Sequence, residues 1–168
     1  MPVPIRVRFW PPLALAGLLA AGSAGAQAPS NCTLSELQDP PRQEYTCADG
    51  VIIVIGKGGD LGFGGENGTS DLTLDAGAVF VDSPGQPVQI RTPQAIAAVR
   101  GTQFAVSVGE GNTAVVVIRG QVGVSSIEGG DEVVLDEGEG VDAIPGQRLE
   151  VKNWGAARVA RMMGIFGR

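Results

Sequence analysis

The sequence contains no histidine, two cysteines and few aromatic side chains. Histidine is the commonest general base and transition-metal ligand, so its absence excludes Ser-His-Asp and Cys-His mechanisms and leaves a zinc site without ligands. The few aromatic residues, among them Tyr45, Phe63 and Trp154, disfavour a cleft that stacks sugar rings. These absences predict a protein that is not an enzyme and that binds no cofactor.

Three glycine-rich stretches come close to known site motifs without matching them. "GVIIVIGKG" (50–58) has Gly58 where a phosphate-binding loop has serine or threonine after its lysine. "GFGGENG" (62–68) has Asn67 in place of the last glycine of G-x-G-x-x-G, and "GVSSIEG" (123–129) lacks the spacing of G-x-S-x-G. We attribute all three to the high glycine content of the chain.

Oxygen ligands for calcium are present in the glycine-rich segment 56–71, which contains Asp60, Glu66, Asn67 and Asp71. The segment does not keep the spacing of an EF-hand loop or of a G-G-x-G-x-D repeat, so a solvated loop is favoured over a calcium site. A carboxylate pair for glycoside hydrolysis stays open, because the separation that it requires is spatial.

The first 26 residues are typical of a secretory signal peptide. Arg6 and Arg8 precede a short apolar run, and Ala24-Gly25-Ala26 is a cleavage site that would leave Gln27 as the first mature residue. The run is well short of the ~20 residues that span a bilayer, and a retained membrane anchor is the disfavoured alternative. We therefore expect a periplasmic or secreted protein with no transmembrane helix after cleavage.

Charge and cysteine content restrict the partners and the compartment. Loss of Arg6 and Arg8 changes the net charge from −6 to −8, and an acidic chain repels the phosphate groups of nucleic acids. Export makes a disulfide between Cys32 and Cys47 the expected state of the two cysteines. Such a bond contributes ~3 kcal/mol in the chain-entropy model and would fix the polar N-terminal strap that we expect over residues 27–44.

Short β segments separated by Gly, Pro, Asp or Ser fill the middle of the chain. Val51-Ile52-Ile53-Val54-Ile55 is continuously apolar, which predicts a strand covered on both faces, whereas residues 104–108 alternate and predict one buried face. Further strands are expected at 72–74, 78–81, 88–90, 114–118, 121–125, 132–135, 140–143 and 148–151. This pattern predicts an all-β sandwich or roll of about ten short strands, with a β-solenoid as the second choice.

The C-terminal segment, residues 152–168, predicts a short basic amphipathic helix. Val159, Met162, Met163 and Phe166 follow helical spacing, and the arginines fall on the other side, namely Arg158, Arg161 and Arg168. We expect this helix to dock on its own sheet. The alternative is a helix that lies on an anionic membrane surface or in the groove of a partner.

The stretch "TPQAIAAVRGTQFAVSV" (92–108) places Arg100-Gly101-Thr102 between apolar strand residues. Its Thr92-Pro93, residues 97–102 and Phe104 resemble the signature of the FecR domain family. The resemblance continues through "TAVVVIRGQVGV" (113–124), which contains Gly120, and covers roughly residues 45–147. It implies a FecR-like β domain over 45–151.

The resemblance implies a non-catalytic periplasmic β domain. In the namesake proteins this domain belongs to a transmembrane regulator that relays receptor occupancy to a sigma factor, a role that we do not expect here because the apolar run opens the chain. We expect a FecR-like module that acts through contacts with an envelope protein, in signalling or assembly. The alternative is an envelope protein that binds a polysaccharide or calcium.

Arg100-Gly101-Thr102 is expected to form a structural corner. Glycine tolerates the positive φ of a bulge or tight corner, and the Thr102 hydroxyl can bond to a neighbouring backbone group. Arg100 is expected to tie loops together by donating to several carbonyls or to a carboxylate. In the alternative, Arg100 is exposed and grips an anionic ligand or partner.

Overall fold

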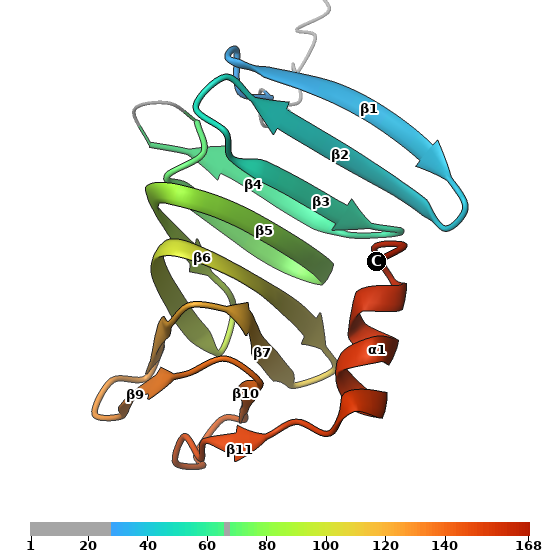
Figure 1. Cartoon of the computed structure of the whole chain (residues 1–168). Coiled ribbons are helices and arrows are strands. Elements are labelled where there is room, and N and C mark those ends of the chain that lie inside the picture. The colour runs from blue at the N-terminus through green and yellow to red at the C-terminus, as the bar shows by residue number, and fades with distance from the viewer. Residues whose placement is uncertain (1–27, 66–67) are drawn as a thin grey trace, which may run out of the picture.

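A computed structural model of the chain describes residues 28–65 and 68–168. The all-β prediction is confirmed, since eleven strands form one open antiparallel sheet that folds into two layers, with one short C-terminal helix beside it (Figure 1). The predicted signal peptide and its cleavage site, Ala26–Gln27, lie outside the described residues, as do Glu66 and Asn67.

The elements follow in chain order. They are β1 (Cys32–Gln38), β2 (Pro41–Cys47), β3 (Ile52–Gly56), β4 (Asp60–Gly64), β5 (Asp71–Arg91), β6 (Ala95–Gly109), β7 (Asn112–Arg119), β8 (Val122–Ser126), β9 (Glu132–Leu135), β10 (Glu139–Ala143), β11 (Lys152–Asn153) and α1 (Ala156–Gly164).

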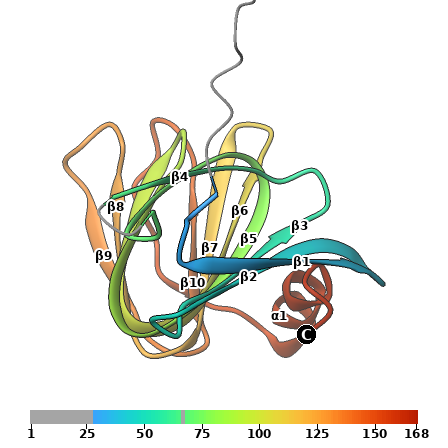
Figure 2. The same cartoon turned by 90° about the horizontal axis from the view of Figure 1, so that it is seen from above.

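Two long strands, β5 and β6, pass through both layers of the sandwich. The first layer runs β1-β2-β3-β5-β6-β7-β10-β11 and uses residues 77–83 of β5 and 102–109 of β6. In the second layer, β4 pairs with residues 71–76 of β5, and residues 87–91 of β5 pair with residues 96–100 of β6. The layer continues from β6 to β8 and then to β9. In Figure 2, β8 and β9 therefore lie on one side of the molecule and α1 lies on the other.

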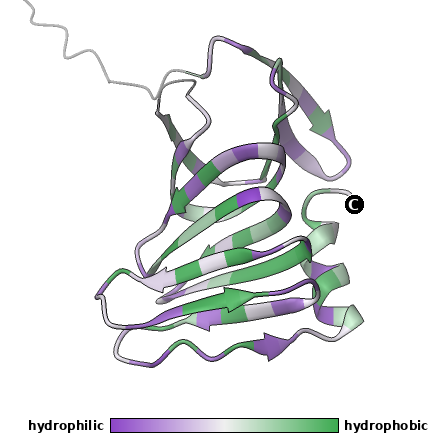
Figure 3. Ribbon diagram, turned by 60° about the vertical axis from the view of Figure 1, so that its left-hand side comes forward, coloured by the Kyte–Doolittle hydropathy of each residue, from purple (hydrophilic) through white to green (hydrophobic). Residues whose placement is uncertain are grey.

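The central strands of the first layer, namely β3, β7 and the first-layer parts of β5 and β6, are apolar on both faces. Ile53 and Ile55 point into the main core between the two layers, whereas Val54 points outward into a second apolar cluster beneath α1. This arrangement confirms the prediction that residues 51–55 form a strand covered on both faces. The second layer alternates instead, with one face in the core and one face in solvent, as the banded hydropathy in Figure 3 shows.

Four expectations about strand boundaries are corrected. The expected strap over 27–44 contains β1 and the first part of β2, and the expected loop over 56–71 contains β4. These strands lie at or near sheet edges and bury few side chains, so their amino-acid composition does not show the apolar pattern that predicts a strand. The segments 72–74, 78–81 and 88–90 are one strand, β5, and residues 148–151 are not a strand.

The C-terminal helix docks on the sheet, although it is shorter than the expected 152–168. Met162 and Phe166 are buried in the outer cluster, and Val159 and Met163 pack against it half-buried. At nine residues, α1 is too short to cross a membrane, and it is the only helix in residues 28–65 and 68–168.

Two arginines expected to face away from the sheet instead help to hold the helix in place. The Arg158 guanidinium lies 3.5 Å from the Trp154 ring centroid and pairs with Asp142 of β10. Arg168 lies beyond the end of α1, where helical spacing no longer applies, and its Nη2 is 3.3 Å from Glu44 Oε2. Charge complementarity with the acidic sheet therefore accounts for part of the basic character of this segment.

A disulfide joins Cys32 and Cys47. The two cysteines are directly opposite each other in the antiparallel register of β1 and β2. The bond therefore fixes the first residue of β1 to the last residue of β2, at the base of the hairpin that begins the first layer.

Candidate partner-binding face

The motif Arg100-Gly101-Thr102 lies where β6 passes from the second layer to the first. Thr102 pairs with Ser83 of β5 and Arg100 pairs with Pro87, so three residues, 84–86, stand opposite Gly101 alone. This bulge bends both strands while they remain paired. Gly101 has φ +69, in the left-handed region that favours glycine.

Thr102 fixes the corner to the connection between β7 and β8. Its side chain is buried, and its hydroxyl donates to the carbonyl oxygen of Gln121 over 2.9 Å. Gly120, with φ +91, lies against this bond, since a Cβ there would be 3.0 Å from Thr102 Oγ1 and 3.1 Å from the Gly101 oxygen. Gly101, Thr102 and Gly120 therefore form one packed corner.

Thr92-Pro93 forms the turn between β5 and β6. The backbone N–H of Thr92 donates to the Ala95 oxygen, and the Thr92 hydroxyl accepts from the Ala95 N–H, each over 2.9 Å. Thr113 of β7 lies 2.8 Å away, hydroxyl to hydroxyl. Phe104 is completely buried in the main core. These motif positions thus fix the backbone and the packing of the fold.

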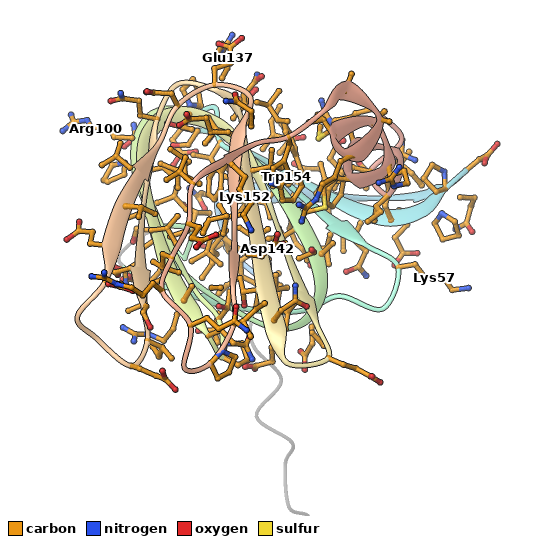
Figure 4. All side chains as sticks on the ribbon, turned by 90° about the horizontal axis from the view of Figure 1, so that it is seen from below. Lys57, Arg100, Glu137, Asp142, Lys152 and Trp154 are labelled. Atoms are coloured by element: carbon orange, nitrogen blue, oxygen red, sulfur yellow. A yellow bond between two sulfur atoms is a disulfide. The ribbon has the colours of Figure 1, made fainter. Side chains whose placement is uncertain are left out.

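Arg100 does not have the structural role expected of it. Its side chain is exposed and points away from the ribbon, and it takes part in none of the side-chain hydrogen bonds or ion pairs of the described part of the chain (Figure 4). The expectation that it ties carbonyls together is wrong, because the Thr102 hydroxyl already bonds across the corner. Strand alternation instead places Arg100 on the outer face of the second layer, with Ala98.

Small side chains occupy the middle of this outer face. Gln89, Ala98, Gly123 and Val134 pair in succession across β5, β6, β8 and β9. Val134 is 58% exposed, the highest value among the large hydrophobic residues described. We call the outward-facing set the open face; it consists of Gln89, Arg91, Ile96, Ala98, Arg100, Gly123, Ser125, Glu132 and Val134.

The open face differs from the outer face of the first layer. There α1 covers the apolar residues, whereas among the described elements none packs over the open face. Arg91 pairs with Ile96, four residues before Arg100 on β6, so the two arginines lie at opposite ends of the face, ~13 Å apart along the strand. Two exposed arginines thus flank small and apolar side chains on a protein whose net charge is negative, and the row of Arg91 ends in the exposed carboxylate of Glu132.

The segment 56–71, in which a calcium site is the alternative to a solvated loop, does not bring its described carboxylates together. Asp60 begins β4, whereas Asp71 pairs with Gly64 at the other end of that strand, so they are ~13 Å apart. Within residues 28–65 and 68–168, no group of three or more cysteine, aspartate or glutamate side chains is arranged to hold a metal. A cavity of 400 Å³ near β10 is lined by both acidic and basic side chains, among them Asp142, Glu150 and Lys152.

Taken with the corner at Gly101, this sandwich defines an all-β module with one covered and one open outer face. The sequence profile described as FecR protein matches residues 38–123, about half of the chain. The chain belongs to the FecR family, as the motif predicts, although the matched region begins earlier and ends earlier than the expected 45–147.

Two crystal structures of a putative anti-sigma factor from Parabacteroides distasonis ATCC 8503 share this fold. Each is 22% identical to this chain, with TM-scores of 0.61 and 0.60. The alignments cover 76% and 77% of this chain, and the chain spans 63% of the length of that protein in both cases. No curated protein sequence matches the chain.

Proposed function

We propose that this chain is a non-enzymatic module that binds another protein through its open face, in signalling across the cell envelope. The observation that carries this proposal is the position of Arg100. It lies within the region that matches the family and in the stretch that resembles the FecR signature, yet its side chain is exposed and has no partner in the described part of the chain. A motif residue with no structural contact is a candidate for contact with a second molecule.

The geometry supports an acidic protein surface as the partner. A guanidinium can donate two parallel hydrogen bonds to a carboxylate, and Gly101 and Thr102 hold the backbone that carries Arg100. Ala98 and Gly123 allow a partner to approach the strands closely, and Val134 offers an apolar contact. A face of this kind combines an apolar centre with a charged rim, as protein interfaces do.

We also propose that the chain is exported and cleaved between Ala26 and Gln27. The Cys32–Cys47 disulfide supports an oxidising compartment, the periplasm or the exterior. The mass of the exported protein should equal that of residues 27–168 less two hydrogens. A mass that includes residues 1–26 would contradict cleavage, and two free thiols would contradict the oxidised state.

The proposal is tested by Arg100→Ala, with Arg161→Ala as the matched control. Both arginines are exposed, but Arg161 lies on α1, far from the open face. Each variant is expressed in a strain that lacks the gene, and the transcripts altered by the deletion are measured. We expect Arg161→Ala to restore the wild-type profile and Arg100→Ala to fail, with unchanged melting temperatures for both proteins. Full rescue by Arg100→Ala, or a large loss of its stability, would contradict the proposal.

A further inference from the structure

The outer edge of β1 is an unprotected sheet edge. β1 pairs with β2 along all seven of its residues without a register shift, and no other described strand pairs with its opposite side. Residues 33–36 are all exposed, and the strand contains no proline or lysine. Proteins usually protect such edges with proline, lysine, bulges or short strands.

The other edge strands of the described sheet carry such protection. The register of β4 shifts between Asp60 and Leu61, β11 has two residues, and β9 has four and begins with Glu132. β1 is therefore the longest regular edge among the described residues.

Leu34 and Glu36 direct their backbone groups to this open edge. The Cys47 N–H donates to the Val51 oxygen, on the side of β2 that faces β3. Cys47 and Cys32 are therefore opposite each other without backbone hydrogen bonds between them. Hydrogen-bonded and non-hydrogen-bonded pairs alternate along an antiparallel ladder, so Leu34 and Glu36, two and four residues further along β1, also form no backbone hydrogen bonds with β2. The N–H of Cys32 accordingly points away from β2, where it donates to the Pro29 oxygen.

An apolar row of the main core ends at this edge. Six residues pair in succession across six strands, namely Leu34, Tyr45, Ile53, Val81, Phe104 and Val117. All are buried except the terminal Leu34, which is 44% exposed. An apolar side chain on a further strand, opposite Leu34, would extend the row by one position.

The neighbouring row ends in a carboxylate beside a cavity. Glu36 pairs with Gln43, which pairs with Ile55, and these three residues help to line a cavity of 290 Å³. The cavity has room for a long side chain next to Glu36. Arg42 and Lys57 also line the cavity, but Arg42 already donates to the Asp39 and Pro40 oxygens, and Glu36 is the side chain next to an added strand. A lysine or an arginine opposite Glu36 therefore complements this position best.

We propose that β1 binds an extended segment of another protein as an additional strand of the sheet. The segment places an apolar side chain opposite Leu34 and, two residues away, a lysine or arginine opposite Glu36. Its main chain bonds to the free N–H and C=O groups of these two residues. The disulfide holds β1 in its paired conformation before binding, which lowers the entropic cost of association. This site is separate from the open face of the second layer and does not depend on the function proposed for it.

A capped heptapeptide, Val-Thr-Lys-Thr-Val-Thr-Val, tests the proposal as an antiparallel strand with its lysine opposite Glu36. Titrated into the ¹⁵N-labelled chain, it should shift the amide signals of Leu34 and Glu36 saturably and slow their hydrogen exchange. The same peptide with glutamate in place of lysine should bind at least about fivefold more weakly. The variant Glu36→Lys should reverse this preference, and because Glu36 is exposed it should fold normally.

Two substitutions of Leu34 separate backbone pairing from side-chain contact. Leu34→Pro removes an N–H that points to the open edge, and proline is tolerated there, so the pairing of β1 with β2 is retained. Leu34→Thr keeps the N–H and loses only apolar area. We expect Leu34→Pro to abolish peptide binding and Leu34→Thr to weaken it.

Other outcomes would overturn the proposal. They are equal binding to both Leu34 variants, signal changes at β4 or β9 instead of β1, and no preference between the two peptides. A dimer in analytical ultracentrifugation that Leu34→Pro abolishes would show that a second copy of this chain occupies the edge, and would also overturn it.

Discussion

Phe166 holds the C-terminal segment against the first layer, and its removal should release α1 without unfolding the sandwich. The side chain is completely buried, and its ring centroid is 6.1 Å from that of Phe80 on β5. A buried Phe→Ala substitution costs about 3–5 kcal/mol. A helix of nine residues is not stable on its own, so its folding depends on this docking.

The expected magnitude follows from these contacts. If Phe166→Ala costs about 3 kcal/mol, the undocked state becomes about 100-fold more populated. The amides of α1 should then exchange about 100-fold faster, and they should still exchange well before those of β5 and β7, whose exposure requires the sandwich itself to unfold. The fluorescence of Trp154, which is buried beside α1, should shift to the red.

The control is Ile165→Ala, because Ile165 is the adjacent apolar residue and is 39% exposed. It should change the exchange of α1 by less than about tenfold, since surface truncations cost little. Hydrogen exchange followed by mass spectrometry measures both variants. Unchanged exchange of α1 in Phe166→Ala would refute the claim that Phe166 holds the helix. Exchange of α1 and of the core strands with the same free energy of opening would refute the claim that α1 opens separately.

Three further predictions concern the sandwich itself. Gly140→Ala places a methyl group against the Trp154 indole and 2.7 Å from the Val115 oxygen, and should cost about 1–3 kcal/mol in urea unfolding. Gly62→Ala, whose Cβ would lie 3.7 Å from its nearest neighbour, the Thr73 Cβ, should be nearly neutral. Gly101→Ala, at φ +69, should lower stability by about 1–2 kcal/mol in the same assay, and an unchanged midpoint would contradict the strained corner. Burial, and less strongly the Glu36 carboxylate, raises the pKa of Tyr45 above its usual value of 10.0. The stability that this phenol contributes is therefore present below about pH 10 and declines as the pH rises further. Absorbance titration measures the pKa, and unfolding at high pH measures the loss of stability.

The sequence predicts elements with a local apolar pattern better than elements that depend on pairing between distant segments. The continuous apolar run 51–55 and the helical spacing of Met162 and Phe166 are local patterns, and each identifies an element covered by another. The continuity of β5 is not local. Residues 83–87 contain two prolines and a glycine and look like the end of a strand, yet β5 stays paired with β6 across the bulge.

The candidate site shows the same division. Local chemistry identifies Gly101 and Thr102 as a corner. The bonding role that it predicts for Arg100 belongs instead to the Thr102 hydroxyl, which donates to the oxygen of Gln121, 19 residues away in the sequence. The open face joins Ala98, Gly123 and Val134 from three strands. Their adjacency depends on the topology, and no spacing in the sequence reveals it.

The central claim is that the open face contacts another protein through Arg100, and site-specific photo-cross-linking in the native cell tests it most directly. A benzophenone side chain is placed at Val134 on the open face or, as the control, at Arg161 on α1. We predict a discrete adduct of higher mass from position 134, none from position 161, and loss of the adduct when Arg100→Ala is added. No adduct at position 134, the same adduct at both positions, or an adduct that persists with Arg100→Ala would contradict the account.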